Sequence, residues 1–213
     1  DYTDGSGNID DIVISAGSTT GTVSFTPSDD SVYEDDEAAT IAISSVSGGS
    51  ATESGTQTVT ITITDNESAG SVTLAVSASS IAENAGSSLT LTATLSSVSD
   101  EDVTVSLSTS GTATEGTDYT DGSGNIDDIT ISAGDTTGTV NFTPTDDSVY
   151  EGNETATIAI SGVSGADATE SGSQSVSVTI TENESAPTVT LTVSATSIAC
   201  LLYTSDAADD TPC

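Results

Sequence analysis

The sequence contains no lysine, arginine or histidine, and this absence sets the first limits on function. Its 34 aspartates and glutamates give a formal net charge of −34. Proteins bind nucleic acid by neutralising phosphates with basic side chains, and anionic membrane surfaces attract basic segments. The composition therefore excludes nucleic acid as a partner and gives no basis for attraction to an anionic membrane surface.

The same absence removes most catalytic chemistry. A serine nucleophile needs a neighbouring base such as histidine or lysine, and the chain has neither. A pair of carboxylates could in principle hydrolyse a glycosidic bond, but there is no tryptophan on which a sugar would stack. We therefore expect that the chain is not an enzyme.

Large side chains and long apolar runs are also scarce. There are five tyrosines and two phenylalanines, so any hydrophobic core must be mostly aliphatic. No run of 18 apolar residues occurs, and we expect no membrane-spanning helix in this chain. The sequence starts without methionine or a signal peptide, which leads us to expect that it is part of a longer protein.

What the sequence does contain is an internal repeat. Residues 1–82 match residues 118–199 at an offset of 117 without a gap. About three-quarters of the aligned positions are identical, which is the signature of tandem domains. We divide the chain into the C-terminal part of a first repeat (1–70), a complete repeat (71–187) and the first strand of a third repeat (188–199).

The complete repeat alternates apolar and polar residues with a period of two, as strands with one buried face do. Its seven predicted strands contain Val72–Val76, Leu89–Leu95, Val103–Leu107, Ile129–Ile131, Val140–Phe142, Ala156–Ile160 and Val176–Ile180. Turn residues separate them. The pattern predicts an all-β chain of tandem immunoglobulin-like, seven-stranded antiparallel β-sandwiches.

The repeat stops at Ala199, and residues 200–213 match neither copy. The segment Cys200–Asp209 resembles one reading frame of a sequencing-library adaptor, so we interpret residues 200–213 as a non-native tail and exclude them from the fold. The alternative is a genuine terminal sequence. Both cysteines lie in this tail, and the repeats themselves give no reason to expect a disulfide or a zinc site.

The most distinctive stretch is acidic. Residues 146–154 contain four carboxylates between two strand patterns, and residues 29–37 repeat the stretch. Two carboxylates 4 Å apart repel by about 1 kcal/mol in water and about 4 kcal/mol at an effective dielectric of 20. With no basic side chain in the sequence, the remaining counter-ion is a hard cation, and calcium accepts many oxygen ligands in flexible geometry. A solvated acidic turn is the alternative.

Four motifs together resemble the Calx-β domain in their order and spacing. They are Ser80–Gly86, Gly111–Tyr119, Asp146–Glu154 and Val178–Glu184. The resemblance covers residues 1–199. It implies a seven-stranded sandwich of the kind found in sodium/calcium exchangers, in some integrin chains and in arrays on bacterial surface proteins.

The resemblance also implies Ca²⁺ sites at one end of each sandwich. In the complete repeat the implied ligands are Glu83, Asp118, Asp146, Asp147, Val149 (through its carbonyl oxygen), Glu151, Glu154, Glu182, Asn183 and Glu184. In the first repeat they are Asp1, Asp29, Asp30, Val32, Glu34, Glu37, Asp65 and Glu67. The family usually ends its last strand with an aspartate run, whereas here the segment reads Glu182-Asn183-Glu184.

Two further stretches have simpler interpretations. Residues 121–128 carry oxygen-bearing side chains at alternate positions, as calcium loops do, but a polar hairpin turn explains the composition better. The threonines of residues 58–64 could form a binding array, yet threonine on the exposed face of a strand is ordinary.

Composition, repetition and resemblance together predict a structural, calcium-binding repeat of a large extracellular or cell-surface bacterial adhesin. Its expected partners are the neighbouring repeats, and a protein or glycan ligand is possible elsewhere on the parent protein. The near-identity of the two copies favours a spacer over the alternative of a ligand-binding adhesive module. A calcium-sensing regulatory domain is the other alternative.

Overall fold

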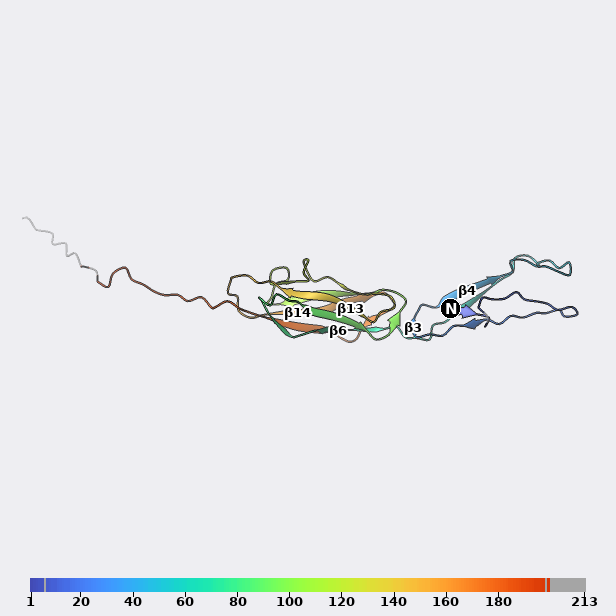
Figure 1. The fold of residues 1–213 in the computed structure, drawn as a ribbon, viewed down its shortest axis with the longest axis horizontal. Coiled ribbons are helices and arrows are strands. Elements are labelled where there is room, and N and C mark those ends of the chain that lie inside the picture. Colours follow the sequence, from blue (N-terminus) through green and yellow to red (C-terminus); the bar gives the residue numbers. More distant parts are fainter. Residues whose placement is uncertain (6, 198, 200–213) are drawn as a thin grey trace, which may run out of the picture.

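The computed structural model describes residues 1–5, 7–197 and 199, and all the regular elements in that part of the chain are strands. The first-repeat segment and the complete repeat lie end to end along the longest axis of the molecule (Figure 1). No helix that could cross a membrane occurs among the described residues. The all-β prediction is confirmed.

The complete repeat is a sandwich of two five-stranded sheets. One sheet has the order β12-β10-β14-β16-β7 and the other the order β11-β13-β8-β6-β15. The long strands are β6 (Ser71–Val76), β8 (Leu89–Leu95), β10 (Val103–Gly111), β12 (Ile129–Ile131), β13 (Thr137–Pro144), β14 (Glu154–Ser164) and β16 (Ser175–Thr181). These are the seven strands that the alternating pattern predicts.

Four short strands were not predicted, and some of them change the pairing from purely antiparallel. They are β7 (Ser80–Ala82), β9 (Val98–Ser99), β11 (Tyr119–Thr120) and β15 (Thr169–Glu170). β7 pairs with β16 and β15 pairs with β6 in parallel. Three of them have two residues, too few for a period-two pattern, and β7 lacks the two large apolar residues that mark the equally short β12.

The core lies between the two sheets and is built from the inward residues of the alternating strands. Leu91, Val105, Ile158 and Val178 are completely buried, as the period-two pattern requires. Phe142 is also completely buried and stacks on Tyr119, with the ring centroids 4.6 Å apart. Burial of a large apolar side chain stabilises a fold by about 1.5–3 kcal/mol, so this layer accounts for much of the stability of the sandwich.

The first-repeat segment forms paired strands but no sandwich. β1 (Tyr2–Thr3) pairs with β2 (Thr26–Pro27), and β4 (Glu37–Ala42) pairs with β5 (Thr58–Ile63). Apolar side chains such as Ile12, Val13 and Val59 are exposed. The reason is that the counterparts of β6, β8 and β10 are not in the chain, so these strands have no second sheet to cover them.

The predicted first strand of a third repeat is not formed. Residues 188–197 have no strand and are exposed. A strand needs a hydrogen-bonded neighbour, and the sequence after Ala199 does not continue to the counterpart of β8. The predicted non-native tail, residues 200–213, lies outside the described residues.

We predict that Phe142→Ala destabilises the complete repeat by about 3–5 kcal/mol, because it removes a buried ring and leaves a cavity. The chain contains a matched control, since Phe25 occupies the same position in the first repeat and stacks on Tyr2 at 4.7 Å. Phe25 is only half-buried, so Phe25→Ala leaves the unfolding midpoint of the complete repeat unchanged. Urea unfolding followed by circular dichroism measures both effects, and equal losses would contradict the assignment of the core.

Candidate metal centre

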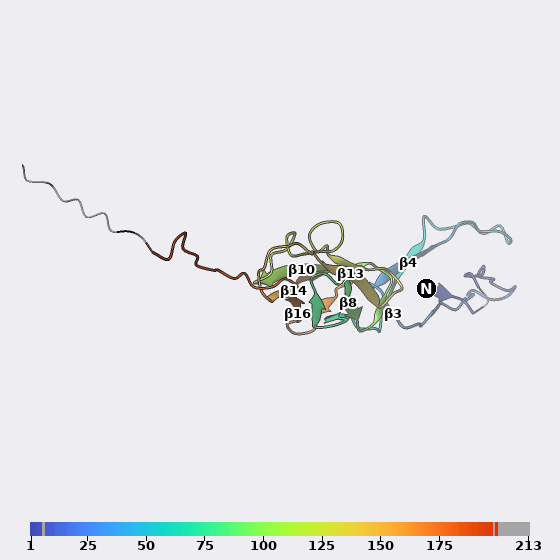
Figure 2. The ribbon, with the colours of Figure 1, turned by 60° about the vertical axis from the view of Figure 1, so that its left-hand side comes forward.

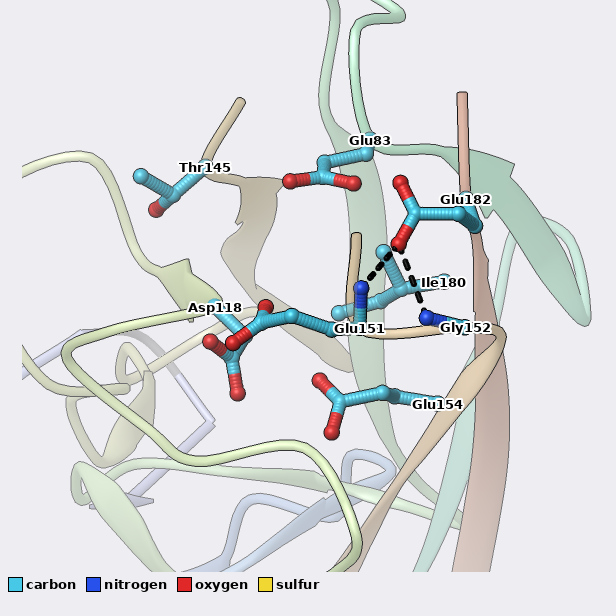
Figure 3. A pocket seen from close by; sticks show the side chains of 8 residues that line it. All are labelled: Glu83, Asp118, Thr145, Glu151, Gly152, Glu154, Ile180 and Glu182. Carbon is cyan, nitrogen blue, oxygen red and sulfur yellow. Dashed lines mark hydrogen bonds between the residues drawn. The ribbon is translucent and has the colours of Figure 1, made fainter. Parts of the chain in front are cut away.

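Four separate segments bring carboxylates together at one end of the complete sandwich. Glu83 follows β7, Asp118 precedes β11, and Glu182 follows β16. The fourth segment is the loop of residues 145–153, which joins β13 to β14 and carries Glu151. Figure 3 shows these side chains around one concave site, which is also lined by Thr145, Gly152, Glu154 and Ile180.

The carboxylates form two sets of three. Glu83, Glu182 and Glu184 each offer an oxygen that lies within 4.8 Å of the other two. Asp118, Glu151 and Glu154 form a second set with the same spacing. Glu83 is only 8% exposed, and most of the others are half-buried, so water screens their mutual repulsion less than it would on an open surface.

Backbone amides anchor Glu182 within the site. Its Oε1 accepts hydrogen bonds from the amides of Asn183 and Glu184, both at 3.0 Å. Its Oε2 accepts them from the amides of Glu151 at 2.6 Å and Gly152 at 2.8 Å. The amides of Glu184 and Glu151, in that order, lower the pKa of Glu182 to about 2, so this carboxylate stays ionised.

The pKa values of four other carboxylates in the site are raised. Burial, followed by the negative charge of Asp118, raises the pKa of Glu154 to about 7. Burial likewise raises the pKa of Glu83 and Glu151, and a hydrogen bond with Glu182 raises the pKa of Glu184. Without a cation, therefore, the centre relieves its repulsion by holding protons.

One buried oxygen in the centre has no hydrogen-bond partner within the described protein. Glu184 Oε2 is the single buried side-chain nitrogen or oxygen among the described residues that has no hydrogen-bond partner. A buried polar atom without a partner costs about 1–3 kcal/mol. Clustered carboxylate oxygens, one of them unpaired, fit Ca²⁺, which takes 6–8 oxygen ligands including water.

The remaining predicted ligands of the complete repeat lie beside these sets rather than in them. Asp147 accepts a hydrogen bond from the amide of Val149 at 2.6 Å, and its own amide donates to Glu83 Oε1 at 3.3 Å. The Asn183 side chain donates to Glu184 Oε1 at 3.2 Å. Asp146 and Val149 are exposed. The side chains of Asp147 and Asn183 therefore take part in hydrogen bonds of the loops, and Asp147 belongs to neither set of three carboxylates.

The first repeat gathers its predicted ligands more loosely. Asp1, Asp29, Asp30, Glu34, Glu37, Asp65 and Glu67 line one concavity, and Val32 is not part of it. Within the described residues, no three of these carboxylates come as close together as the two sets above. The counterparts of β7 and Glu83 are not in the chain, so one wall of the site is missing.

The two acidic loops differ at Gly152, which stands where the first repeat has Asp35. Gly152 has φ of +84°, a conformation that glycine adopts freely, and the amides of Glu151 and Gly152 both donate to Glu182. Asp35 stands at the same place in the first repeat and has no such positive φ, and there only the amide of Glu34 reaches Asp65, at 3.2 Å. The change from Asp35 to Gly152 between two nearly identical loops was the available signal.

The stretch 121–128 forms a turn, as its composition predicts. Asp121 Oδ1 accepts hydrogen bonds from the amides of Ser123 and Gly124 at 2.6 and 2.9 Å. Hydrogen bonds from Ser123 and then Gly124 lower the pKa of Asp121. The carboxylate is thus engaged by its own loop, and no set of three close ligands includes it.

We predict that the metal-free protein loses stability as pH rises. The pKa of Glu154 is about 7 when folded against an ordinary 4.5, so the folded state holds a proton that the unfolded chain has released. The free energy of unfolding therefore falls between about pH 4.5 and 7. Glu182 is ionised in the folded state across this window, and the unfolded chain completes its ionisation within about one pH unit above 4.5, so its opposite contribution is confined to the lower edge. Glu154→Gln makes the fall shallower in melting curves recorded in EDTA, and an unchanged slope would contradict the raised pKa.

Comparison with known proteins identifies the family of the chain. The Calx-β domain profile matches the chain twice, over residues 1–67 and 65–184. No curated protein sequence matches it. One similar solved structure is the crystal structure of the apo form of the Calx CBD1 domain, which is 18% identical, has a TM-score of 0.43 and covers 54% of this chain and 98% of that one. The two profile matches span most of the chain, and it therefore belongs to the Calx-β domain family, whose members are calcium-binding modules.

Proposed function

We propose that the chain is a calcium-stiffened structural repeat of a large extracellular bacterial surface or secreted protein of the adhesin type. The observation that carries the proposal is the pair of three-carboxylate sets in a protein without a basic side chain. Their mutual repulsion is relieved by calcium at the end of each sandwich. Calcium reaches millimolar concentrations outside cells, where modules of weak affinity fill.

Within the proposed site each group has a distinct part. Glu83, Glu182 and Glu184 would hold one ion, and Asp118, Glu151 and Glu154 would hold another. Glu182 is already ionised, but each of its oxygens accepts two amide hydrogen bonds, so it would exchange one of these bonds for the ion. Glu154 must release its proton to bind, which makes the affinity rise with pH. Bound calcium would supply the positive charge that the chain lacks.

The similarity of the two copies supports a structural role over ligand recognition. The acidic loop keeps Asp-Asp-Ser-Val-Tyr-Glu unchanged from residues 29–34 to residues 146–151. Loops that recognise a ligand commonly vary while the scaffold is kept, whereas these vary no more than the strands. The alternative of a glycan- or protein-binding module rests on the exposed Tyr150.

We predict that calcium raises the melting temperature of the complete repeat far more than magnesium, or than sodium at matched ionic strength. Binding contributes about 2.7 kcal/mol at a hundredfold excess over the dissociation constant. Magnesium is less effective because it demands octahedral geometry and gives up its water reluctantly. Differential scanning calorimetry measures the shift.

Single substitutions separate site binding from general screening. Glu83→Gln and Glu154→Gln each remove a ligand from one set, so each lowers the calcium-induced shift. Asp135→Asn removes the same charge from an exposed turn away from the site and keeps the shift. Equal shifts with all three cations, or equal effects of all three variants, would mean screening alone.

A structural role carries its own test. A spacer has to resist pulling, so calcium increases the force at which the complete repeat unfolds in single-molecule stretching. A calcium-dependent melting temperature without any change in that force would favour a sensor or ligand-binding module instead.

A further inference from the structure

The two repeats are joined by one tyrosine and a short strand. β3 (Val32–Tyr33), which belongs to the acidic loop of the first repeat, pairs in parallel with β9 (Val98–Ser99) of the complete repeat. The amide of Asp100 donates to the carbonyl oxygen of Tyr33 at 3.3 Å. The ring of Tyr33 packs against the core of the complete repeat. Both views place β3 at the end of the sandwich that faces the first-repeat segment (Figures 1 and 2).

Tyr33 contacts a turn of the complete repeat that contains Ala166 and Asp167. The Tyr33 hydroxyl donates to Asp167 Oδ2 at 3.1 Å. Asp167 and Ala166 have φ of +46° and +51°, a conformation that side chains other than glycine adopt rarely. Gly165 precedes them, and a Cβ there would lie 2.2 Å from the carbonyl oxygen of Asp102. The turn therefore holds the carboxylate of Asp167 where the tyrosine arrives.

The complete repeat presents the same pair of residues without a partner. Val149 and Tyr150, the counterparts of Val32 and Tyr33, are 56% and 45% exposed. The preceding turn is the same in both loops, since Asp30 Oδ1 accepts from the amide of Val32 at 2.8 Å and Asp147 Oδ1 from that of Val149 at 2.6 Å. The same six-residue segment thus offers its valine and tyrosine in one case to a neighbour and in the other to solvent.

We propose that Val149 and Tyr150 form the docking surface for a following Calx-β repeat, which receives them on its copies of β9 and of the turn at Asp167. The sequence supports this occupant, because residues 188–199 repeat residues 71–82 directly after the complete repeat. The preceding joint supplies the geometry. The same valine–tyrosine contact, repeated every 117 residues, would then connect each sandwich to the next.

The connecting segment differs at one position that bears on the proposal. Pro187 stands where the first joint has Gly70. A Cβ on Gly70 would lie 2.5 Å from Cδ1 and 2.8 Å from Cγ of Leu95, which is a buried core residue. Proline keeps the carbonyl oxygen that Gly70 offers to the amide of Thr169 at 3.1 Å. The second joint therefore requires the leucine at the position of Leu95 in the following repeat to shift.

The joint consists of backbone pairing and a tyrosine contact, so it does not depend on the calcium proposal. The experiment uses residues 1–199 continued by a second copy of residues 83–187, which completes the third repeat and omits both cysteines. Val149→Cys is combined with Val98→Cys in the appended copy. The positive control pairs V32C with V98C in the original copy, and the negative control pairs the exposed V59C with the appended V98C.

We expect the Val149 pair to form an intramolecular disulfide to the same extent as the Val32 pair, in EDTA or in calcium. Cross-linking no greater than that of the V59C control in both buffers would overturn the proposal. If calcium fails to stabilise the protein, the docking proposal still stands. If the disulfide fails to form, the calcium proposal still stands.

A second measurement needs no cysteine. In the 213-residue chain, Tyr33→Ala speeds hydrogen exchange at the Asp100 amide by about five- to tenfold, as loss of a hydrogen bond and a packed ring would cause. Tyr150→Ala has no effect on any amide of the complete sandwich beyond its own loop. In the extended chain Tyr150→Ala speeds exchange at the appended copy of Asp100 to the same degree. An effect of Tyr150→Ala that is equal in both chains, or absent from both, would contradict the docking role.

Discussion

The repulsion among carboxylates in a protein without basic side chains is the constraint on which the rest of this structure depends. Six acidic groups converge at one end of the complete sandwich in two sets, each within 4.8 Å. Backbone amides stabilise the negative charge of Glu182 and keep it ionised. Glu154 instead retains a proton, which reduces the total negative charge of the site. An oxygen of Glu184 is left without a partner. What the chain cannot supply is a positive charge, and calcium would supply it.

One loop serves both the ion site and the connection between repeats. In residues 146–151, Glu151 faces the carboxylate set while Val149 and Tyr150 face away from it into solvent. In the preceding repeat the equivalent valine and tyrosine already hold the next sandwich. A cation that orders this loop would also fix the residues that make the joint. This double role is consistent with the identity of residues 29–34 and 146–151 in two copies that differ at several strand positions.

The sequence predicts the main strands well and the details of the site only in part. Alternation located the seven long strands because each has one buried face. The convergence of Glu83, Asp118, Glu151 and Glu154 followed from family resemblance, since they lie far apart in the sequence. The hydrogen bonds of Asp147 and Asn183 within the loops depend on backbone geometry that no residue pattern specifies. The loss of a sandwich in residues 1–63 reflects missing partner strands rather than any local property.

The most direct test of the calcium account is a crystal structure of the chain grown with calcium and then with terbium, which marks calcium positions by anomalous scattering. The account predicts one ion among Glu83, Glu182 and Glu184 and a second among Asp118, Glu151 and Glu154, with Glu184 Oε2 as a ligand. Crystals that show no ion at either set at millimolar calcium, with the carboxylates protonated or turned to solvent, would contradict it.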